Sequence, residues 1–178
     1  MNEQGNQTGG TPARPLWAPW RIEFVAAPKP DGCFLCDKGR PGTDDVANLV
    51  IARGRLCYLL LNAFPYNSGH LLVAPYRHIP DLSDMTREEM MELLDLTLQA
   101  KAAMQRCMHP AGFNFGFNLG AAAGAGVPGH IHGHLVPRWI GDTNFMPVIG
   151  DTRVVPQSLA DTATVLRQAW TADAATRP

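Results

Sequence analysis

The stretch Gly129-His130-Ile131-His132-Gly133-His134-Leu135-Val136-Pro137 places three histidines at alternate positions. In an extended strand, residues i, i+2 and i+4 project from one face at intervals of roughly 7 Å, so the spacing predicts three imidazoles facing one bound molecule. Near neutral pH, imidazole can act as a nucleophile, an acid, a base or a metal ligand. An alternating pair by itself is most typical of a metal site or an exposed polar face, whereas the flanking glycines, which allow close approach of a ligand, favour a reaction site here.

The patterns around this stretch predict a sheet and two helices. Runs typical of strands occupy residues 46–52, 56–62 and 70–74, and Phe113–Leu119 alternates three phenylalanines with polar or small residues. Thr86-Arg87-Glu88-Glu89 has the spacing of a capping box, which begins a long helix that we expect to reach about Gln105. Its apolar stripe consists of Met90, Leu93, Leu94, Thr97, Leu98 and Met104. A terminal helix is expected over 158–169, with anchors at Leu159, Val165, Leu166 and Trp170.

These elements occur in blocks, which predicts an α+β fold with a five-stranded antiparallel sheet, one long helix and a C-terminal helix. At 178 residues and 46% hydrophobic side chains, the chain can bury one good core, and we expect a single domain over residues 16–170. Residues 1–15 lack apolar periodicity and are expected to be a disordered tail. Trp17 and Trp20 are expected to anchor the start of the domain, and residues 171–178 to form a frayed tail.

Charge and composition limit the partners. A net charge of -1 argues against binding nucleic acid or an anionic membrane through bulk electrostatics. No apolar run approaches the roughly 20 residues that span a bilayer, and residues 1–15 do not read as a signal peptide. We therefore expect a cytoplasmic protein without a membrane or nucleic-acid partner, in which the four cysteines are reduced or bind metal.

Two motifs carry a resemblance to a known family. The run His130–Val136 resembles the signature of the histidine triad (HIT) superfamily, in which three histidines alternate with apolar residues. The segment from Asn62 through Gly69-His70 to Pro75 is similar to the strand–turn–strand with which that family holds a nucleoside. Together with the helix between them, the resemblance covers about residues 30 to 140. It implies a HIT-like fold, commonly assembled as a homodimer in which two sheets join.

The resemblance also implies roles for individual residues. His132, the middle histidine, matches the family's nucleophile, and His134 would contact phosphate oxygens. Asn62 matches an Asn or Asp on the ribose hydroxyls, and His70 and Asn118 match residues near the phosphates. An amide offers a donor and an acceptor to a vicinal diol, which suits Asn62, although an asparagine at this place is also typical of a turn cap.

The sequence departs from the family before and within the triad. Many hydrolytic members carry a Ser or Gln a few residues before the first histidine, whereas residues 124–129 offer no side-chain donor, only the backbone N–H groups of a glycine loop. This argues against hydrolysis of simple nucleotide amides. Gly133 replaces an apolar residue, and we expect it to widen the opposite face of its strand.

The segment after the triad refines the resemblance. Residues 137–146 resemble the corresponding segment of bacterial diadenosine tetraphosphate phosphorylases and related HIT proteins, in which inorganic phosphate attacks the intermediate. Arg138 and Asn144 are candidates for holding distal phosphates, although an arginine at a strand end is more often only solvated.

A metal site is predicted from cysteine spacing and from the resemblance. Cys33 and Cys36 have the two-residue gap with which one backbone turn presents two thiolates to zinc, and such a pair alone is equally typical of a redox or unliganded pair. Zinc-bearing HIT relatives use two cysteines, a histidine placed like His78, and the first histidine of the triad, here His130. The resemblance therefore implies a structural zinc that occupies His130.

The functional hypothesis is a nucleotide-binding enzyme. It would cleave a dinucleoside polyphosphate or a related nucleotidyl ester at the α-phosphate through a nucleotidyl-His132 intermediate, with phosphate favoured over water as the acceptor. The alternatives are a nucleotidyltransferase to a sugar phosphate, for which a second domain is not evident, and a zinc-organised module that binds nucleotides without turnover.

Overall fold

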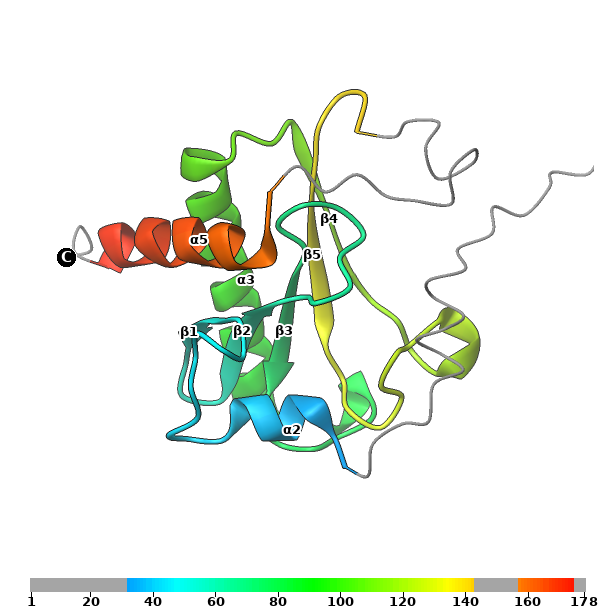
Figure 1. Ribbon diagram of the computed structural model, residues 1–178. Coiled ribbons are helices and arrows are strands. Elements are labelled where there is room, and N and C mark those ends of the chain that lie inside the picture. Colours follow the sequence, from blue (N-terminus) through cyan, green and yellow to red (C-terminus); the bar gives the residue numbers. More distant parts are fainter. Residues whose placement is uncertain (1–31, 143–156, 175–178) are drawn as a thin grey trace, which may run out of the picture.

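The structure is a computed structural model that describes residues 32–142 and 157–174. Along the chain lie α2 (Phe34–Gly39), β1 (Val50–Arg53), β2 (Cys57–Leu61), β3 (Leu71–Pro75), α3 (Arg87–Cys107), β4 (Gly112–Phe117), β5 (Gly133–Arg138) and α5 (Leu159–Ala174), with single 3-10 turns at Leu82–Asp84 and Ala121–Ala123 (Figure 1). The predictions for residues 1–15, Trp17, Trp20 and Asn144 lie outside the described residues.

The strands form one antiparallel sheet in the order β1-β2-β3-β5-β4. This confirms the predicted five-stranded sheet and α+β fold. The first strand begins at Val50 rather than at Val46. The Asp44 carboxylate accepts hydrogen bonds from the backbone N–H groups of Val46 and Ala47, which holds this part of the expected strand in a turn.

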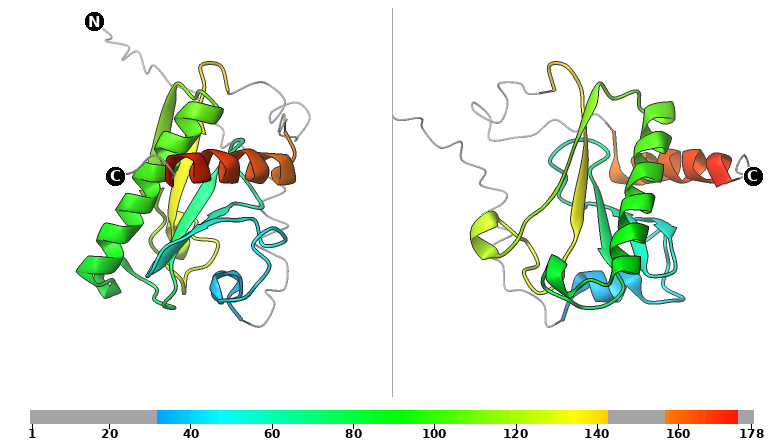
Figure 2. Two further views of the ribbon diagram at one scale, coloured as in Figure 1. Left: turned by 90° about the vertical axis from the view of Figure 1, so that its left-hand side faces the viewer. Right: turned by 180° about the vertical axis from the view of Figure 1, so that it is seen from behind.

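The two faces of the sheet have different coverings. Helices α3 and α5 cross each other on one face, as the two views of Figure 2 show, and α2 packs against the other. Alternation along β2 produces this division, because successive side chains of a strand point to opposite faces. Leu59 and Leu61 pack with the α3 and α5 side chains, whereas Tyr58 and Leu60 pack with Leu35 of α2.

Helix α3 begins with the capping box that the sequence predicts. Thr86 Oγ1 accepts from the Glu89 backbone N–H, and the Glu89 carboxylate accepts from the Thr86 backbone N–H. Its buried face is shifted from the predicted stripe. Leu93, Thr97 and Met104 are buried, but the stripe members Met90, Leu94 and Leu98 are exposed, and the core instead takes Leu96, Ala100 and Ala103.

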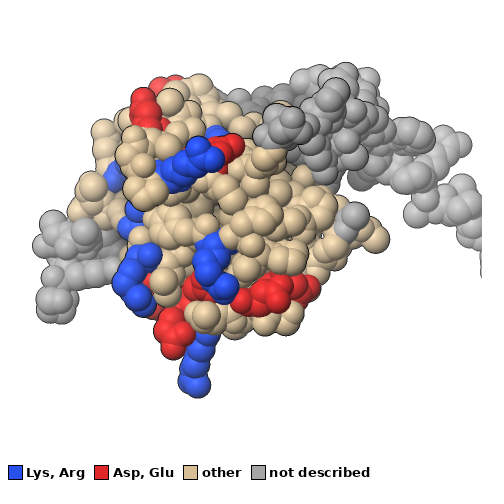
Figure 3. All heavy atoms as spheres, turned by 90° about the horizontal axis from the view of Figure 1, so that it is seen from below, with Lys and Arg blue, Asp and Glu red and all other residues tan. Residues whose placement is uncertain are grey.

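Helix α5 is longer than expected and continues through Ala174, into the range expected to be a frayed tail. Leu166 is buried in the core, and the partly buried Leu159 and Trp170 pack against that core. No helix in the described ranges is long and apolar enough to cross a membrane. On the face seen in Figure 3, Lys and Arg side chains are interspersed with Asp and Glu, which matches the small net charge.

Candidate active site and metal centre

Four side chains from three separate parts of the chain meet at one end of the sheet. Cys33 and Cys36 come from the start of α2, His78 follows β3, and His130 precedes β5. One ligand atom from each lies within 4.8 Å of all the others. The His130 ring is fully buried, and its edge faces the His78 ring with centroids 5.2 Å apart.

The contacts within this cluster fit a zinc ion. His130 Nδ1 lies 3.3 Å from Cys33 Sγ and 3.4 Å from Cys36 Sγ, and His78 Nδ1 lies 3.3 Å from Cys36 Sγ. Two thiolates and two imidazoles are a typical donor set for tetrahedral structural zinc. Burial, and then the adjacent Cys33 thiol, raise the pKa of Cys36 to about 11, so a bound cation is what would hold the Cys36 sulfur as a thiolate. The cluster confirms the predicted metal site.

His130 is also fixed from its other side. Its Nε2 lies 2.9 Å from the Pro75 carbonyl oxygen, which can only accept, so Nε2 carries the proton and Nδ1 faces the cysteines. A carbonyl partner on the second ring nitrogen is typical of a metal-binding histidine. The ring is therefore oriented for metal binding by the end of β3.

The three triad histidines do not share one face of one strand, which corrects the first prediction from their spacing. Strand β5 begins at Gly133, so His130 and His132 precede the ladder. A backbone hydrogen bond from His130 to Val127 and one from Ile131 to Ile79 hold this segment in a turn and against the chain after β3. Consequently the His130 ring joins the metal cluster, whereas the His132 and His134 rings remain neighbours, 4.9 Å apart.

His132 has the geometry of a neutral imidazole with one ring nitrogen reserved. Its Nδ1 lies 2.8 Å from the His130 carbonyl oxygen, so Nδ1 carries the proton and Nε2 bears the lone pair. The side chain is buried, and burial lowers the pKa of His132, although the carbonyl contact opposes this effect. An unprotonated Nε2 near neutral pH is what a nucleophilic imidazole requires.

His70 lies behind His134 and is fully buried at the start of β3. Its Nε2 is 3.0 Å from His134 Nδ1, and its Nδ1 accepts from the Tyr66 backbone N–H at 3.0 Å. On the other side of His134, the Asn118 amide nitrogen lies 3.3 Å from Nε2. Asn118 directly follows β4, where Gly116 pairs with His134, so the face of that strand opposite the phenylalanines turns toward the site.

Asn62 joins this group through its amide. Its Oδ1 accepts from the Phe64 backbone N–H at 3.0 Å, and its Nδ2 lies 3.2 Å from His70 Nδ1. The structure thus shows the turn cap that was the alternative for Asn62, in a side chain that also touches the site. The ribose contact stays a prediction.

Sequence reasoning assigned no role to Tyr66, whose ring lies against two of the histidines. Its centroid is 4.6 Å from that of His70 and 5.9 Å from that of His134. A signal was available, because Tyr66 stands between Asn62 and His70 in the turn that the motif singles out.

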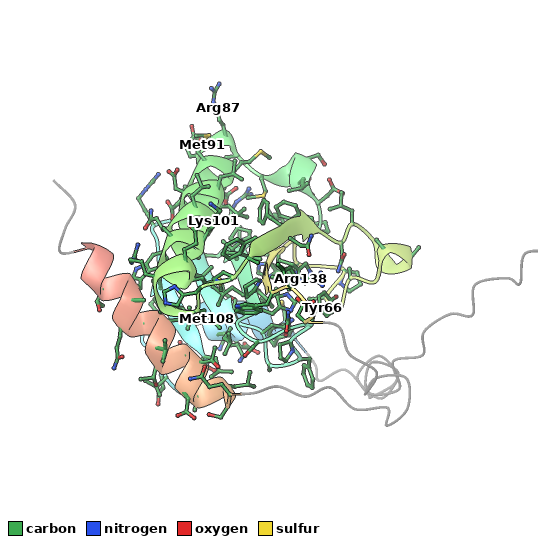
Figure 4. All side chains as sticks on the ribbon, turned by 90° about the horizontal axis from the view of Figure 1, so that it is seen from above. Tyr66, Arg87, Met91, Lys101, Met108 and Arg138 are labelled. Carbon is green, nitrogen blue, oxygen red and sulfur yellow. The ribbon has the colours of Figure 1, made fainter. Side chains whose placement is uncertain are left out.

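Arg138 is engaged by protein partners. Its guanidinium donates to both Asp142 oxygens, at 2.6 and 2.8 Å, and to Asn114 Oδ1 at 3.0 Å. Asn67 donates to the same Asp142 carboxylate at 2.8 Å, so this acid ties the loop before His70 to the end of β5. Figure 4 shows Tyr66 and Arg138 away from Met91 at the start of α3. Binding of distal phosphates by Arg138 stays a prediction, in which phosphate would compete with Asp142.

The space opposite Gly133 is filled, which corrects the expectation that this glycine widens that face. A Cβ at Gly133 would lie 3.1 Å from Val73 and 3.2 Å from each of the Phe115 and Phe117 rings. Because a Cβ rarely comes so close to other carbon atoms, the glycine allows three large side chains to pack against β5.

Comparison with known proteins agrees with this geometry. Residues 44–139 match the HIT domain family. The chain is 43% identical over 162 residues to the AP-4-A phosphorylase of Mycobacterium tuberculosis (strain ATCC 25618 / H37Rv), across 87% of this chain and 83% of that protein.

Solved structures have the same fold. A Zn-bound histidine triad family protein from Mycobacterium smegmatis superimposes with a TM-score of 0.67 and 26% identity, covering 82% of this chain and 98% of that chain, and supports zinc at the Cys33, Cys36, His78 and His130 cluster. The diadenosine triphosphate hydrolase of Plasmodium falciparum matches with a TM-score of 0.56 and 18% identity, over 88% of this chain and 95% of that chain. With the family match spanning more than half of its residues and both histidine clusters in place, the chain belongs to the histidine triad (HIT) family.

Proposed function

We propose that the protein is an enzyme that cleaves a dinucleoside polyphosphate, of the diadenosine tetraphosphate type, at an α-phosphate through a nucleotidyl-His132 intermediate. The observation that carries this proposal is the 2.8 Å contact between His132 Nδ1 and the His130 carbonyl oxygen, which leaves the Nε2 lone pair for attack. The identity to a mycobacterial AP-4-A phosphorylase supports the substrate class.

The reaction has two displacements at phosphorus. In the first, His132 Nε2 forms a bond to the α-phosphorus while the bond to the bridging oxygen breaks, and a nucleoside polyphosphate leaves with the electron pair. In the second, an oxygen of the acceptor attacks the same phosphorus, the N–P bond breaks, and the lone pair returns to Nε2. His134 would donate a hydrogen bond to a non-bridging oxygen, where negative charge has to be stabilised.

The chemistry of the leaving group supports a polyphosphate over an amide. A leaving nucleoside polyphosphate is stable as an anion, so it departs without a proton. A leaving amine has to be protonated, and the loop at 124–129 has no side chain that could supply the proton. The lack of a Ser or Gln there is thus compatible with phosphoanhydride cleavage.

Zinc would be held by Cys33, Cys36, His78 and His130 and would supply rigidity by cross-linking α2 to the chain on both sides of the site. The protein's own part is to keep the His130 backbone in place, because its carbonyl orients the His132 ring. His130 would thus serve the site through its main chain and the metal through its side chain.

Inorganic phosphate is the acceptor that we favour, and a product assay tests it. Diadenosine tetraphosphate is incubated with the purified protein, with and without added phosphate. A phosphorylase forms ATP and ADP only when phosphate is present, whereas a hydrolase forms ATP and AMP without it. Absence of turnover on dinucleoside polyphosphates, with tight nucleotide binding, would contradict the enzyme and favour a zinc-organised binding module.

We further propose a homodimer. The α3 side chains Met90, Met91, Leu94 and Leu98 are 39–63% exposed, and Phe115 on the edge strand β4 is 41% exposed. Lys101 of α3 lies 5.9 Å from the Phe113 ring, which places the helix beside this edge. A second copy covering this apolar surface explains why Met90, Leu94 and Leu98 of the predicted stripe do not face the core. Leu98→Glu should yield monomers in sedimentation analysis, whereas Val46→Glu, at another exposed apolar residue, should not.

A further inference from the structure

The hydrogen-bond roles of the two His70 ring nitrogens can be read from their partners. The Tyr66 backbone N–H points at His70 Nδ1 from 3.0 Å, and a backbone N–H can only donate. The Asn62 amide also identifies His70 Nδ1 as an acceptor. Its Oδ1 accepts from the Phe64 backbone N–H, so Nδ2 is the atom that lies 3.2 Å from His70 Nδ1. Two donors therefore meet at this nitrogen, which cannot carry a proton.

The position of the proton on His70 also determines the position of the proton on His134. A neutral imidazole without a proton on Nδ1 carries it on Nε2, and His70 Nε2 lies 3.0 Å from His134 Nδ1. His70 is thus the donor in this contact and His134 Nδ1 the acceptor. His134 then carries its own proton on Nε2. A second proton on its Nδ1 would face the N–H of His70, so the pair also disfavours the imidazolium form of His134.

We propose that His70 is a positioning residue that holds His134 as the neutral tautomer protonated on Nε2, with that N–H directed at the phosphate of the substrate. The contact between His134 Nε2 and the Asn118 amide marks this direction, because Asn118 lies on the side of the ring opposite His70. The Asn118 atom that faces His134 Nε2 at 3.3 Å is the amide nitrogen, which is a donor like the N–H assigned here. The amide oxygen and nitrogen have the same shape, so a half-turn of the amide exchanges them and lets Oδ1 accept the Nε2–H. The role rests on the proposed function and differs from direct phosphate contact by His70, which is fully buried.

Tyr66 completes the arrangement. Its backbone N–H defines the His70 tautomer, and its ring lies against both imidazoles. Packing of an aromatic ring on this side keeps water from competing for the hydrogen bond between His70 and His134. Tyr66 thus acts on the pair of His70 and His134 through two groups, its backbone N–H and its ring.

Long-range proton–nitrogen correlation NMR on protein labelled with nitrogen-15 histidine tests the proposal without substrate, because a ring nitrogen with a proton and one without differ widely in chemical shift. We expect His70 and His134 both to carry the proton on Nε2. The His70 and His134 signals are assigned by their loss in His70→Gln and His134→Asn. Replacement of the exposed His109, which lies outside the site, by Asn is the control for histidine replacement. A proton on Nδ1 of either residue would overturn the proposal.

Two variants separate positioning from packing. His70→Gln retains a side-chain N–H that can reach His134 Nδ1, whereas His70→Leu fills the space without a donor. We expect His134 to keep its tautomer in the glutamine variant and to become a mixture of tautomers in the leucine variant, with kcat lowered roughly 10- to 100-fold and KM little changed. An unchanged His134 spectrum in a folded His70→Leu protein would refute the role. If that variant does not fold, the wild-type and glutamine spectra decide.

Failure of this inference can be told from failure of the proposed function. The tautomers are read on the protein without nucleotide, whereas the nucleophile is read by trapping the nucleotidyl group on His132. Labelled His132 together with a proton on His70 Nδ1 would remove the positioning role and leave the function standing. The expected tautomers without any labelling of His132 would remove the proposed intermediate.

Discussion

The metal cluster and the catalytic cluster contain neighbouring residues of one short motif, yet the fold treats them differently. His130 turns toward two cysteines and His78, whereas His132 lies beside His134 and outside the metal cluster. The division is made where the sheet ladder begins, at Gly133. The two clusters still share one residue, because the His130 carbonyl oxygen accepts a hydrogen bond from the Nδ1–H of His132. Alternate spacing in a sequence therefore does not guarantee a common face.

The largest expected effect is loss of activity on replacement of His132, which should leave the metal cluster intact. His132→Ala should lower kcat at least about 10⁴-fold, because the covalent route is removed, while zinc content and melting temperature change little. Product formation measures kcat and elemental analysis measures the zinc content, on the same sample; thermal unfolding gives the melting temperature. Turnover equal to that of the His109→Asn control would exclude His132 as the nucleophile.

The second prediction removes a ligand of the metal cluster and leaves the catalytic side chains unchanged. Cys36→Ser should abolish zinc binding and lower the free energy of unfolding by more than about 4 kcal/mol, because the cross-link between α2 and the sheet end is lost. Activity should fall through displacement of the His130 backbone. Cys107→Ser, a cysteine outside the cluster, is the control and should keep its zinc. A Cys36→Ser protein that retains stoichiometric zinc would show that the ligand set is wrong.

An ion pair beside the metal cluster gives a smaller, pH-dependent effect. Arg77, next to His78, donates to both oxygens of the buried Glu89 carboxylate, and this hydrogen bonding lowers the pKa of Glu89 to about 2. Because the folded-state pKa lies below the unfolded value, the stabilisation is present above about pH 4.5 and is lost as the pH falls toward 2. Glu89→Gln should cost about 2 kcal/mol at pH 7.

Urea unfolding of wild type and Glu89→Gln at pH 7 and pH 3 measures this effect. The difference should shrink at pH 3. Glu88→Gln, an exposed neighbour, should show none. A constant difference between the two pH values would mean that the Glu89 charge is not the source.

The smallest expected effect is at Gly133, the boundary between the clusters. Gly133→Ala should destabilise the protein by about 1–2 kcal/mol, because Val73 and two phenylalanine rings have to move. His134 is the next residue of β5, so kcat should fall while zinc binding is retained. Gly112→Ala, with open space around the added methyl group, is the control. Equal melting temperatures for the two variants would contradict the packing argument.

Much of the fold followed from local patterns. The capping box at Thr86 and Glu89 predicted the start of α3, and alternation along Phe113–Leu119 predicted β4. The apolar stripe of α3 wrongly predicts burial of Met90, Leu94 and Leu98 in the core, because periodicity identifies an apolar face and not what covers it. The start of β1 was misplaced because a side chain, Asp44, competes for the backbone N–H groups of Val46 and Ala47.

The sequence by itself determined the donor types, the order of the two motifs and the family they resemble, since these depend only on side-chain chemistry and spacing. Tertiary structure decided which partners each group has. Cys36 and His78 are 42 positions apart, and Tyr66 and Asp142 touch the site through contacts that no local pattern contains. The tautomer of each imidazole is set by the donors and acceptors that face its two nitrogens. The tautomers of His70, His132 and His134 can therefore be inferred only from the folded structure.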